Sequence, residues 1–461
     1  MILILSVFIL PVVCFAADIT DPITFLGIRI EFILFALVLT GVALFHNHTF
    51  WVALTGLAVI LTYKLLFDPA FNTFEHFFGK NHSLIHQLFD KDSRQGEWSI
   101  IVNLLGLLLG FALLARLFEE SGIPEASSKY LPSDWKAPFI LLLFVMILSA
   151  IFDNIAAAMI GGAIALIVFN KRVHIGYIVA IVAASNAGGA GSVIGDTTTT
   201  MMWIDGVSAI NVSRAFIASF VAFMFFGWFA SNQQHKYQYI RHKYKESHPI
   251  DWRKIIAIVT VLVGAIFGNI LFNLPAAGVW IALVIAFTYT KIPWHELSKA
   301  LKGTIFLLCL VTCASLMPVE TLPEPSWLTT FILGFVSSVF DNIPLTKLCL
   351  EQGHFDWCML AYAVGFGGSM IWFGSSAGVA ITNEFPEARN VFLWLKKGWH
   401  VTVAYILGFF VLYLVMGWQP ASNTKHTEPA INCKDKNCKV TVKARNQIIN
   451  RGAIKFQLKV E

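Results

Sequence analysis

Long apolar stretches joined by short polar loops make up most of the chain between about residues 24 and 418. Apolar runs of about 18 residues or more are long enough to cross a bilayer as α-helices, whereas a soluble core interrupts its apolar runs with polar faces. The pattern predicts membrane-spanning helices at about 24–46, 50–67, 98–118, 175–203, 211–231, 253–273, 275–290, 303–318, 358–381 and 399–418.

Two other apolar stretches, 137–170 and 327–352, are interrupted by Asp153-Asn154 and by Asp341-Asn342. Lys and Arg in short loops indicate the cytoplasmic side. When the most basic loop, 232–254, is placed inside, the other basic loops also fall inside only if each interrupted stretch enters and leaves on the same side. The charges therefore predict two re-entrant helical hairpins that open to opposite sides.

Composition agrees with an all-α polytopic membrane protein, because 57% of the 461 residues are hydrophobic and 13% are charged. A soluble domain carries about 25% charged residues. The net charge of +5 is spread over the loops, so we read it as an orientation signal and expect the lipid bilayer, not a nucleic acid, as the partner.

The two interruptions belong to a repeated motif. Ser149-Ala-Ile-Phe-Asp-Asn-Ile155 matches Ser337-Ser-Val-Phe-Asp-Asn-Ile343 at an offset of 188 residues. Gly188-Gly189 with Gly195-Asp196 matches Gly367-Gly368 with Gly374-Ser375 at an offset of 179. Duplicated halves with interrupted apolar segments indicate a secondary transporter. We expect two inverted repeats, at about 98–231 and 303–418, each with a hairpin and a broken helix.

The motifs also contain the chemistry of a candidate ion site. Carboxylates inside membrane segments are costly and point to function, and glycines within a span permit unwound backbone. Hard cations prefer oxygen ligands. The candidate ion-binding and proton-coupling residues, with Na⁺ as the hypothetical ion at the same positions, are Asp153, Asn154, Asn186, Asp196, Thr197, Thr198, Asp341, Asn342, Ser369 and Ser375.

Structural roles stay open for the same motifs. The glycines of 188–191 could serve packing alone, Asp153 and Asp341 could cap the hairpin helices, and the threonines of 197–200 could bond to their own backbone. Lys347 could pair with Asp341 or Glu351, extend to the surface, or act as a permanent internal cation.

The remaining reactive residues suggest no cofactor and no enzyme. The seven cysteines lack a convincing metal spacing, and we assign no metal site to His76, His82 and His86 in the polar insertion 68–97. The chain offers no nucleophile–base pair and no phosphate-binding loop, so a membrane-embedded enzyme or scaffold is only a remote alternative.

The two ends differ from the transporter domain at 18–419. Residues 1–17 resemble a signal peptide or an uncleaved anchor, although they lack a basic start. The polar tail, 420–461, falls on the periplasmic side by the charge count. There Cys433 and Cys438 could form a disulfide, and alternation at 440–443 and 454–460 is compatible with a small β-hairpin.

With these motifs, the chain resembles the NhaD-type sodium/proton antiporter family, within a superfamily that includes arsenite permeases and citrate or dicarboxylate carriers. The resemblance covers about 24–418 and is most specific at Gly195-Asp-Thr-Thr-Thr199. This chain departs from the family pattern in having Ala156 in place of an expected proline, Gly191 in place of a bulkier residue, and Lys347 and Glu351 in place of small apolar residues.

The resemblance implies antiport of Na⁺ or Li⁺ against H⁺ by alternating access, in a bacterial inner membrane and as a homodimer. An arsenite or organic-anion carrier is the alternative within the same superfamily. A basic residue lining the site would favour that alternative, and Lys347 is the candidate.

Overall fold

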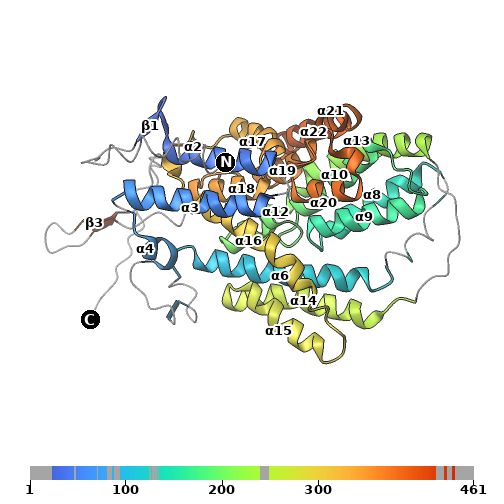
Figure 1. Ribbon diagram of the computed structural model, residues 1–461, viewed down its shortest axis with the longest axis horizontal. Helices are drawn as coiled ribbons and strands as arrows, with labels where there is room; N and C mark the ends of the chain where they lie inside the picture. The colour runs from blue at the N-terminus through green and yellow to red at the C-terminus, as the bar shows by residue number, and fades with distance from the viewer. Residues whose placement is uncertain are drawn as a thin grey trace.

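Helices make up most of the computed structural model (Figure 1), which describes residues 23–45, 48–69, 71–79, 86–87, 94–123, 126, 132, 134–238, 249–421, 430–432 and 439–441. Within these residues, six segments are long and apolar enough to cross a membrane. Their helices are α3 (Thr49–Phe67), α6 (Trp98–Glu119), α13 (Phe216–Tyr237) with the short α12 (Ala209–Ser213) before it, α14 (Trp252–Phe272), α16 (Glu296–Ser315) and α22 (Trp399–Met416). The predicted all-α polytopic membrane fold is confirmed.

Shorter elements complete the bundle. The shorter apolar helices are α2 (Ile30–Leu44), α8 (Lys136–Ser149), α9 (Asn154–Val168), α10 (Ile175–Ala190), α15 (Pro275–Phe287) and α17 (Trp327–Val339). The others are α4 (Thr73–Phe78), α11 (Thr197–Ile204), α18 (Asn342–Gln352), α19 (Trp357–Gly367), α20 (Ser376–Glu384) and α21 (Val391–Lys397), with 3-10 turns η4 (Val319–Thr321), η5 (Gly368–Met370) and η6 (Pro386–Arg389). Strand β1 (Thr24–Phe25) pairs with β2 (Ile28–Arg29), and β3 (Ala430–Asn432) pairs with β4 (Lys439–Thr441), both antiparallel.

Three predicted boundaries were wrong. The stretch that starts at about 24 begins with the strand pair, so its helix starts at Ile30. The helix expected from 303 starts at Glu296, and the one expected over 211–231 runs on to Tyr237. The added turns of both helices contain charged and polar side chains. A prediction based on apolar stretches omits such turns, although the helix continues through them.

The breaks in the apolar stretches coincide with the motif residues. Helix α8 ends at Ser149 and α9 begins at Asn154, with Asp153 as its N-cap; α18 begins after Asp341 in the same way. Helix α10 ends at Ala190 and α11 begins after Asp196. Helix α19 ends at Gly367, and α20 begins after Ser375. Each motif therefore ends one helix and starts the next.

Corresponding residues of the two motif sets make corresponding contacts. Ser149 Oγ donates to Ser185 O (2.5 Å), and Ser337 Oγ donates to Val364 O (2.7 Å). The backbone of α8 also approaches Gly188, since a Cβ there would lie 2.0 Å from Met146 O. In the other half, a Cβ at Gly367 would lie 2.4 Å from Gly334 O. These pairs keep the 188-residue and 179-residue offsets of the sequence motifs, whereas the opposite orientation of the hairpins stays a prediction from loop charge.

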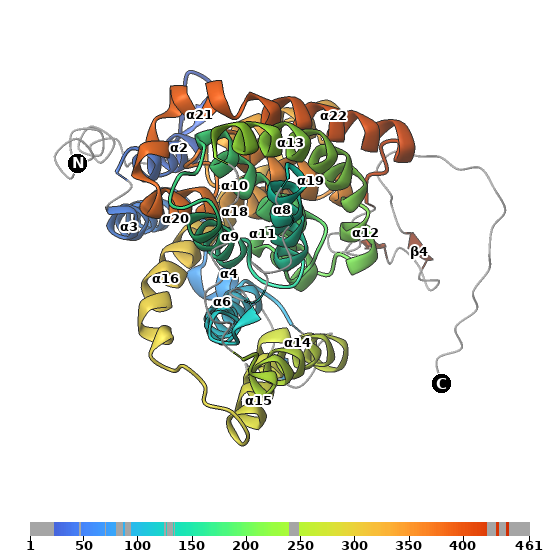
Figure 2. The same ribbon diagram turned by 90° about the vertical axis from the view of Figure 1, so that its right-hand side faces the viewer.

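Helix α6 lies between two groups of helices (Figure 2). On one side it packs against α14, α15 and α16, and on the other side it contacts α9 and α11, which begin at Asn154 and Thr197. Helix α16 in turn packs against α18. The helices that begin at the motif aspartates therefore meet a separate wall formed by α6 and its neighbours.

A buried polar contact joins the start of α10 to α13. His174 Nδ1 accepts from Gly176 N (3.1 Å) as the helix cap, and the His174 backbone N donates to Gln234 Oε1 (2.7 Å). Burial, together with the nearby charge of Lys397, lowers the pKa of His174. The capping role requires an unprotonated Nδ1, so the fold uses neutral imidazole here.

Substitution of Gly188 by Ala is expected to destabilise the fold by about 1–3 kcal/mol, because the added Cβ meets the backbone oxygen of Met146 and the helices must move apart. Gly303→Ala is the control: a Cβ there meets nothing within 4 Å, and Ala favours a helix over Gly by up to about 1 kcal/mol. Thermal unfolding in detergent measures both. Equal stability of the two variants would contradict the close approach.

The His174 cap predicts a pH dependence of stability. A lowered folded-state pKa means that the stabilisation is complete above the unfolded-state pKa of about 6.5 and is lost as pH falls through the lower folded-state value. His174→Asn keeps a capping oxygen that does not titrate. The unfolding temperature of this variant is expected to fall less than that of the wild type between about pH 7.5 and 5.5. Parallel curves would exclude His174 as the source.

Candidate functional site

Three aspartates lie at the helix breaks, with Asp196 interacting with each of the other two. Asp153 and Asp341 each accept a hydrogen bond from the backbone N–H two residues later, at 3.2 Å from Ile155 and 3.0 Å from Ile343. Asp196 interacts electrostatically with both of the other aspartates. Asp196 is buried, whereas Asp153 and Asp341 are partly exposed. The capping role considered for Asp153 and Asp341 is therefore correct, and Asp341 Oδ2 also accepts from Ser376 Oγ at 3.4 Å.

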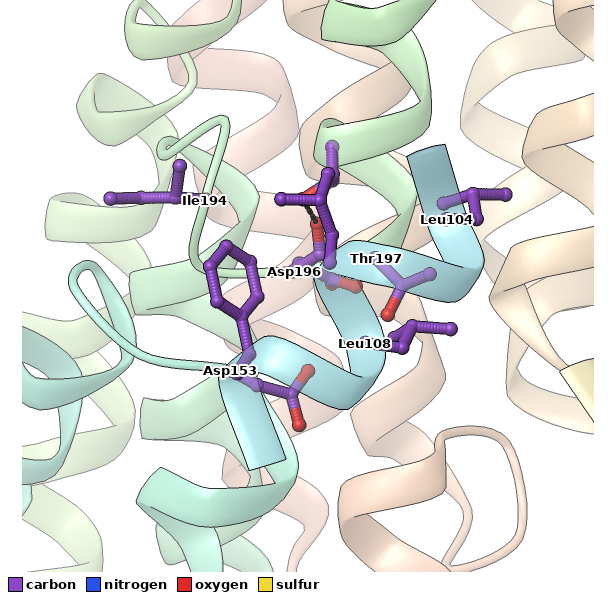
Figure 3. A pocket seen from close by; sticks show the side chains of 9 residues that line it. Leu104, Leu108, Asp153, Ile194, Asp196 and Thr197 are labelled. Carbon is purple, nitrogen blue, oxygen red and sulfur yellow. Dashed lines mark hydrogen bonds between the residues drawn. The ribbon is translucent and has the colours of Figure 1, made fainter. Parts of the chain in front are cut away.

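A small cavity of about 10 Å³ lies beside two of these carboxylates. Figure 3 shows Asp153, Asp196 and Thr197 around it, together with Leu104 and Leu108 of α6. The cavity has about the room that one water molecule requires, and a bare Na⁺ ion is no larger than water. One side of the cavity is therefore acidic and the other is an apolar helix face.

Asp196 has one satisfied and one free oxygen atom. Its Oδ1 accepts from the backbone N of Thr198 at 3.1 Å. Its Oδ2 is buried without a hydrogen-bond partner within the described chain, and the buried hydroxyl of Thr198 has no partner there except its interaction with the Asp196 carboxyl group. A buried polar atom without a partner costs about 1–3 kcal/mol. An unpaired carboxylate oxygen atom and a hydroxyl group two residues apart mark a position where a ligand would supply the missing contacts.

The next two threonines have a structural role. Thr199 Oγ1 donates to Ser192 O (2.5 Å) and to Asp196 O (2.9 Å), and Thr200 Oγ1 donates to Val193 O and Asp196 O (both 2.9 Å). These hydroxyls satisfy carbonyl groups in the unwound segment between α10 and α11, which a membrane interior requires. Backbone bonding, considered for the whole threonine run, therefore applies to its second half.

Asn186 connects the two halves of the protein. Its Nδ2 donates to Ser369 Oγ (3.0 Å) and to Ser375 Oγ (3.1 Å), and its Oδ1 accepts from Asn154 Nδ2 (3.1 Å). All four side chains are buried. Four of the predicted site residues, two from each motif set, are thus in contact, whereas Asn342 Nδ2 has no partner among the described residues.

Lys347 lies apart from this centre, in an ionic cluster. Its ammonium group is 2.6 Å from Glu97 Oε2, which precedes α6, and it also pairs with Glu351. The side chain is 1% exposed. Pairing with Glu351 was one of the predicted possibilities, while pairing with Asp341 and extension to the surface were wrong. The partner that the sequence did not reveal is Glu97, because it lies 250 residues earlier in the chain.

Sequence reasoning also missed the α6 wall and the role of Gly365. Leu104, Leu107, Leu108 and Phe111 line the cavity, but they look like any other apolar residues of a span. A Cβ at Gly365 would lie 3.5 Å from Asp196 Oδ2. The signal for Gly365 was its alignment with Asn186 at the 179-residue offset, where one repeat has an amide and the other has no side chain.

Other predictions are tested less completely. Among the described residues, no group of three or more His, Cys, Asp or Glu side chains is arranged to hold a metal ion. His76 Nε2 instead lies 3.1 Å from Ser315 Oγ. His82, the segment 1–17, and Cys433 and Cys438 lie outside the described residues. In the tail, the hairpin of β3 and β4 uses strands different from the expected pair, sharing only 440–441 with it.

Comparison with known proteins gives matches of different extent. A "46 kDa membrane protein" of Mycobacterium leprae is 22% identical over 79% of this chain and 94% of its own length. The Na(+)/H(+) antiporter NhaD of Alkalimonas amylolytica is 33% identical, but over 17% of each chain. Sodium/proton antiporter 1 of Arabidopsis thaliana is 26% identical over 47% of this chain and 44% of its own. The alignments with these two antiporters thus cover less than half of their lengths.

The family assignment rests on a longer match. The model of a family described as citrate transporter matches residues 32–352, which is more than half of the chain and includes both hairpins and the first broken helix. The antiporter relatives agree with the resemblance read from the Gly-Asp-Thr-Thr-Thr motif. The chain therefore belongs to the citrate transporter (CitMHS) family of membrane transporters and is related to the NhaD sodium/proton antiporters.

Proposed function

We propose that this protein is a Na⁺(Li⁺)/H⁺ antiporter whose exchanging group is Asp196. The main support for this proposal is the buried Asp196 carboxylate. Its Oδ2 has no hydrogen-bond partner in the described chain, and the carboxylate lines a cavity together with Asp153. A cation at Oδ2 replaces the missing contact, and a proton on the same oxygen atom does so as well. Competition of the two ions for one carboxylate couples their movements.

The charge of the site supports a cation over an organic anion. The electrostatic partners found for Asp153, Asp196 and Asp341 within the described chain include no Lys or Arg side chain. Helix N-termini attract anions. Here the aspartates themselves cap α9, α11 and α18, and Ser375 caps α20. An anion carrier would offer free N–H groups at its helix N-termini. In this protein, a citrate carboxylate would meet aspartate carboxylates at three of these helix N-termini.

Lys347 does not alter this balance. Its ammonium group contacts two carboxylates, Glu97 and Glu351, and is almost fully buried between them. A cation that is already paired twice offers little to a substrate anion, and separating it from its partners would leave buried charges uncompensated. The departure from the family pattern at Lys347 therefore gives no support to anion transport.

The arrangement around α6 supports alternating access. Helix α6 closes one side of the cavity with leucines, and it packs against α14 to α16 on its other face. Movement of the motif-bearing helices along this apolar wall would expose the carboxylates first to one side and then to the other. We propose the bacterial inner membrane as the location, with a homodimer as the assembly and the tail on the periplasmic side.

Replacement of Asp196 by Asn is expected to reduce Na⁺- and Li⁺-driven proton exchange by on the order of tenfold or more, because an amide neither holds the proton nor balances the cation. Dequenching of a ΔpH-sensitive dye in everted vesicles measures the exchange. Glu387→Gln in η6, an exposed position, removes a carboxylate that belongs to neither motif set and serves as the control. Exchange by Asp196→Asn at the rate of the control would refute the proposal.

Thr198→Val removes the buried hydroxyl while keeping the side-chain shape. We expect the apparent KM for Na⁺ to rise about threefold to tenfold with little change in thermal stability, because the hydroxyl interacts with no group other than the Asp196 carboxylate within the described chain. Thr382→Val is the matched control, since the buried Thr382 hydroxyl donates to Val379 O in its own helix. An unchanged KM for Thr198→Val would remove this hydroxyl from the site.

Because the family is described as citrate transporter, citrate is the competing substrate. Proteoliposomes separate the two possibilities, because a Na⁺ gradient alone should move protons through an antiporter, and labelled citrate should stay outside. Citrate uptake together with absent Na⁺-driven proton movement would overturn the proposal in favour of an anion carrier.

A further inference from the structure

The two motif sets correspond residue by residue, so their differences can be compared directly. The contacts of Ser149 and Ser337, and of Gly188 and Gly367, establish the correspondence at the two offsets. At the same offsets, Asn154 corresponds to Asn342, Asn186 to Gly365, and Asp196 to Ser375. The backbone agrees: Asp196 has φ −144° and ψ 143°, and Ser375 has φ −142° and ψ 151°.

In one half of this pseudosymmetric pair, the polar side chains hydrogen-bond to one another. The Asn186 amide accepts from Asn154 and donates to the hydroxyl oxygen atom of Ser375. A second N–H of the same amide donates to Ser369 Oγ. The amide hydrogen atoms present positive charge to two hydroxyl oxygen atoms, which is what a cation would do at that position.

On the other side, the corresponding residues are Asn342, Gly365 and Asp196. Gly365 has no side chain to take the place of Asn186, and a carboxylate stands where the first side has the hydroxyl of Ser375. Asp196 Oδ2 and Asn342 Nδ2 are both buried without a hydrogen-bond partner in the described residues. Which way an amide points is an assignment from the hydrogen-bond network, and rotation by a half-turn would offer the Asn342 oxygen atom to a cation.

We infer that each chain has a single alkali-cation site, at Asp196 Oδ2 on the Gly365 side, where the pseudosymmetry also places Asn342, and that the Asn186 amide takes the corresponding position in the other half; the small cavity that Asp196 shares with Asp153 is not a second site. This inference rests on the proposed antiport and adds its cation number. A repeat of two hairpins and two broken helices offers two equivalent positions. The neutral amide of Asn186 fills one of these positions. The carboxylate of Asp196 lines the other, where a positive partner is needed.

A cation at Asp196 Oδ2 also explains why Gly365, inside a packed helix, has no side chain. The three heavy atoms nearest to a Cβ built at Gly365 are those of Ala190 and Asp196, and the nearest lies at 3.3 Å. A larger side chain there would reach the free carboxylate oxygen atom. Gly365 thus keeps Asp196 Oδ2 available, and an asparagine at this position would reproduce the arrangement around Asn186.

The test measures cation binding and does not depend on transport. Purified full-length protein is titrated with NaCl and with LiCl by isothermal titration calorimetry, with choline chloride in the reference titration. The wild type is expected to bind one Na⁺ per chain with a Hill coefficient of one. Two Na⁺ ions per chain would overturn the single-site inference while leaving antiport intact. No heat from either ion would overturn this inference and the proposed function together.

Gly365→Asn tests the location. The new amide is expected to donate to Asp196 Oδ2 and weaken Na⁺ binding by on the order of tenfold to a hundredfold. Gly303→Asn introduces the same side chain at an open position of α16 and is expected to bind like the wild type. Wild-type affinity in a folded Gly365→Asn protein would refute the assigned side. If Gly365→Asn does not fold, the wild-type stoichiometry still decides the number of sites.

Discussion

Backbone groups that are freed inside a membrane must find partners within the protein, and this constraint governs the centre of the structure. Four helices begin at motif residues, and each has a side-chain cap: Asp153, Asp196, Asp341 and Ser375. The hydroxyls of Thr199 and Thr200 satisfy carbonyl groups in the unwound segment before α11. The same side chains that make the breaks tolerable also bring carboxylates together, so the fold and the ion site share one set of residues.

The difference between the two halves gives the centre its chemistry. Where one half places Ser375 and the Asn186 amide, the other places Asp196 and Gly365. Strict symmetry would have produced either two satisfied networks or two unpaired carboxylates. The observed combination leaves one buried carboxylate oxygen atom without a partner, which suits a transporter that exchanges one ion for another at a single group.

Charge is distributed so that the centre stays acidic. The cation most deeply placed in the hairpin region, Lys347, is neutralised by Glu97 and Glu351. The family name points to an organic anion, and the antiporter relatives point to sodium. The local charges and the capped helix N-termini favour the cation, because three of the four helix starts carry an aspartate that would repel a carboxylate substrate and the fourth is capped by Ser375.

The apolar spans, the two interrupted stretches and the motif residues could be predicted from the sequence, because membrane helices need long apolar runs and polar residues inside them stand out. The offset between the halves could be read there as well. The contact of Asn186 with Ser375, the closing of the cavity by α6 and the pairing of Lys347 with Glu97 became visible in the folded chain alone. Those contacts join positions far apart in the chain. The leucines of α6 and Gly365 carry no distinguishing chemistry until the fold sets them against a carboxylate.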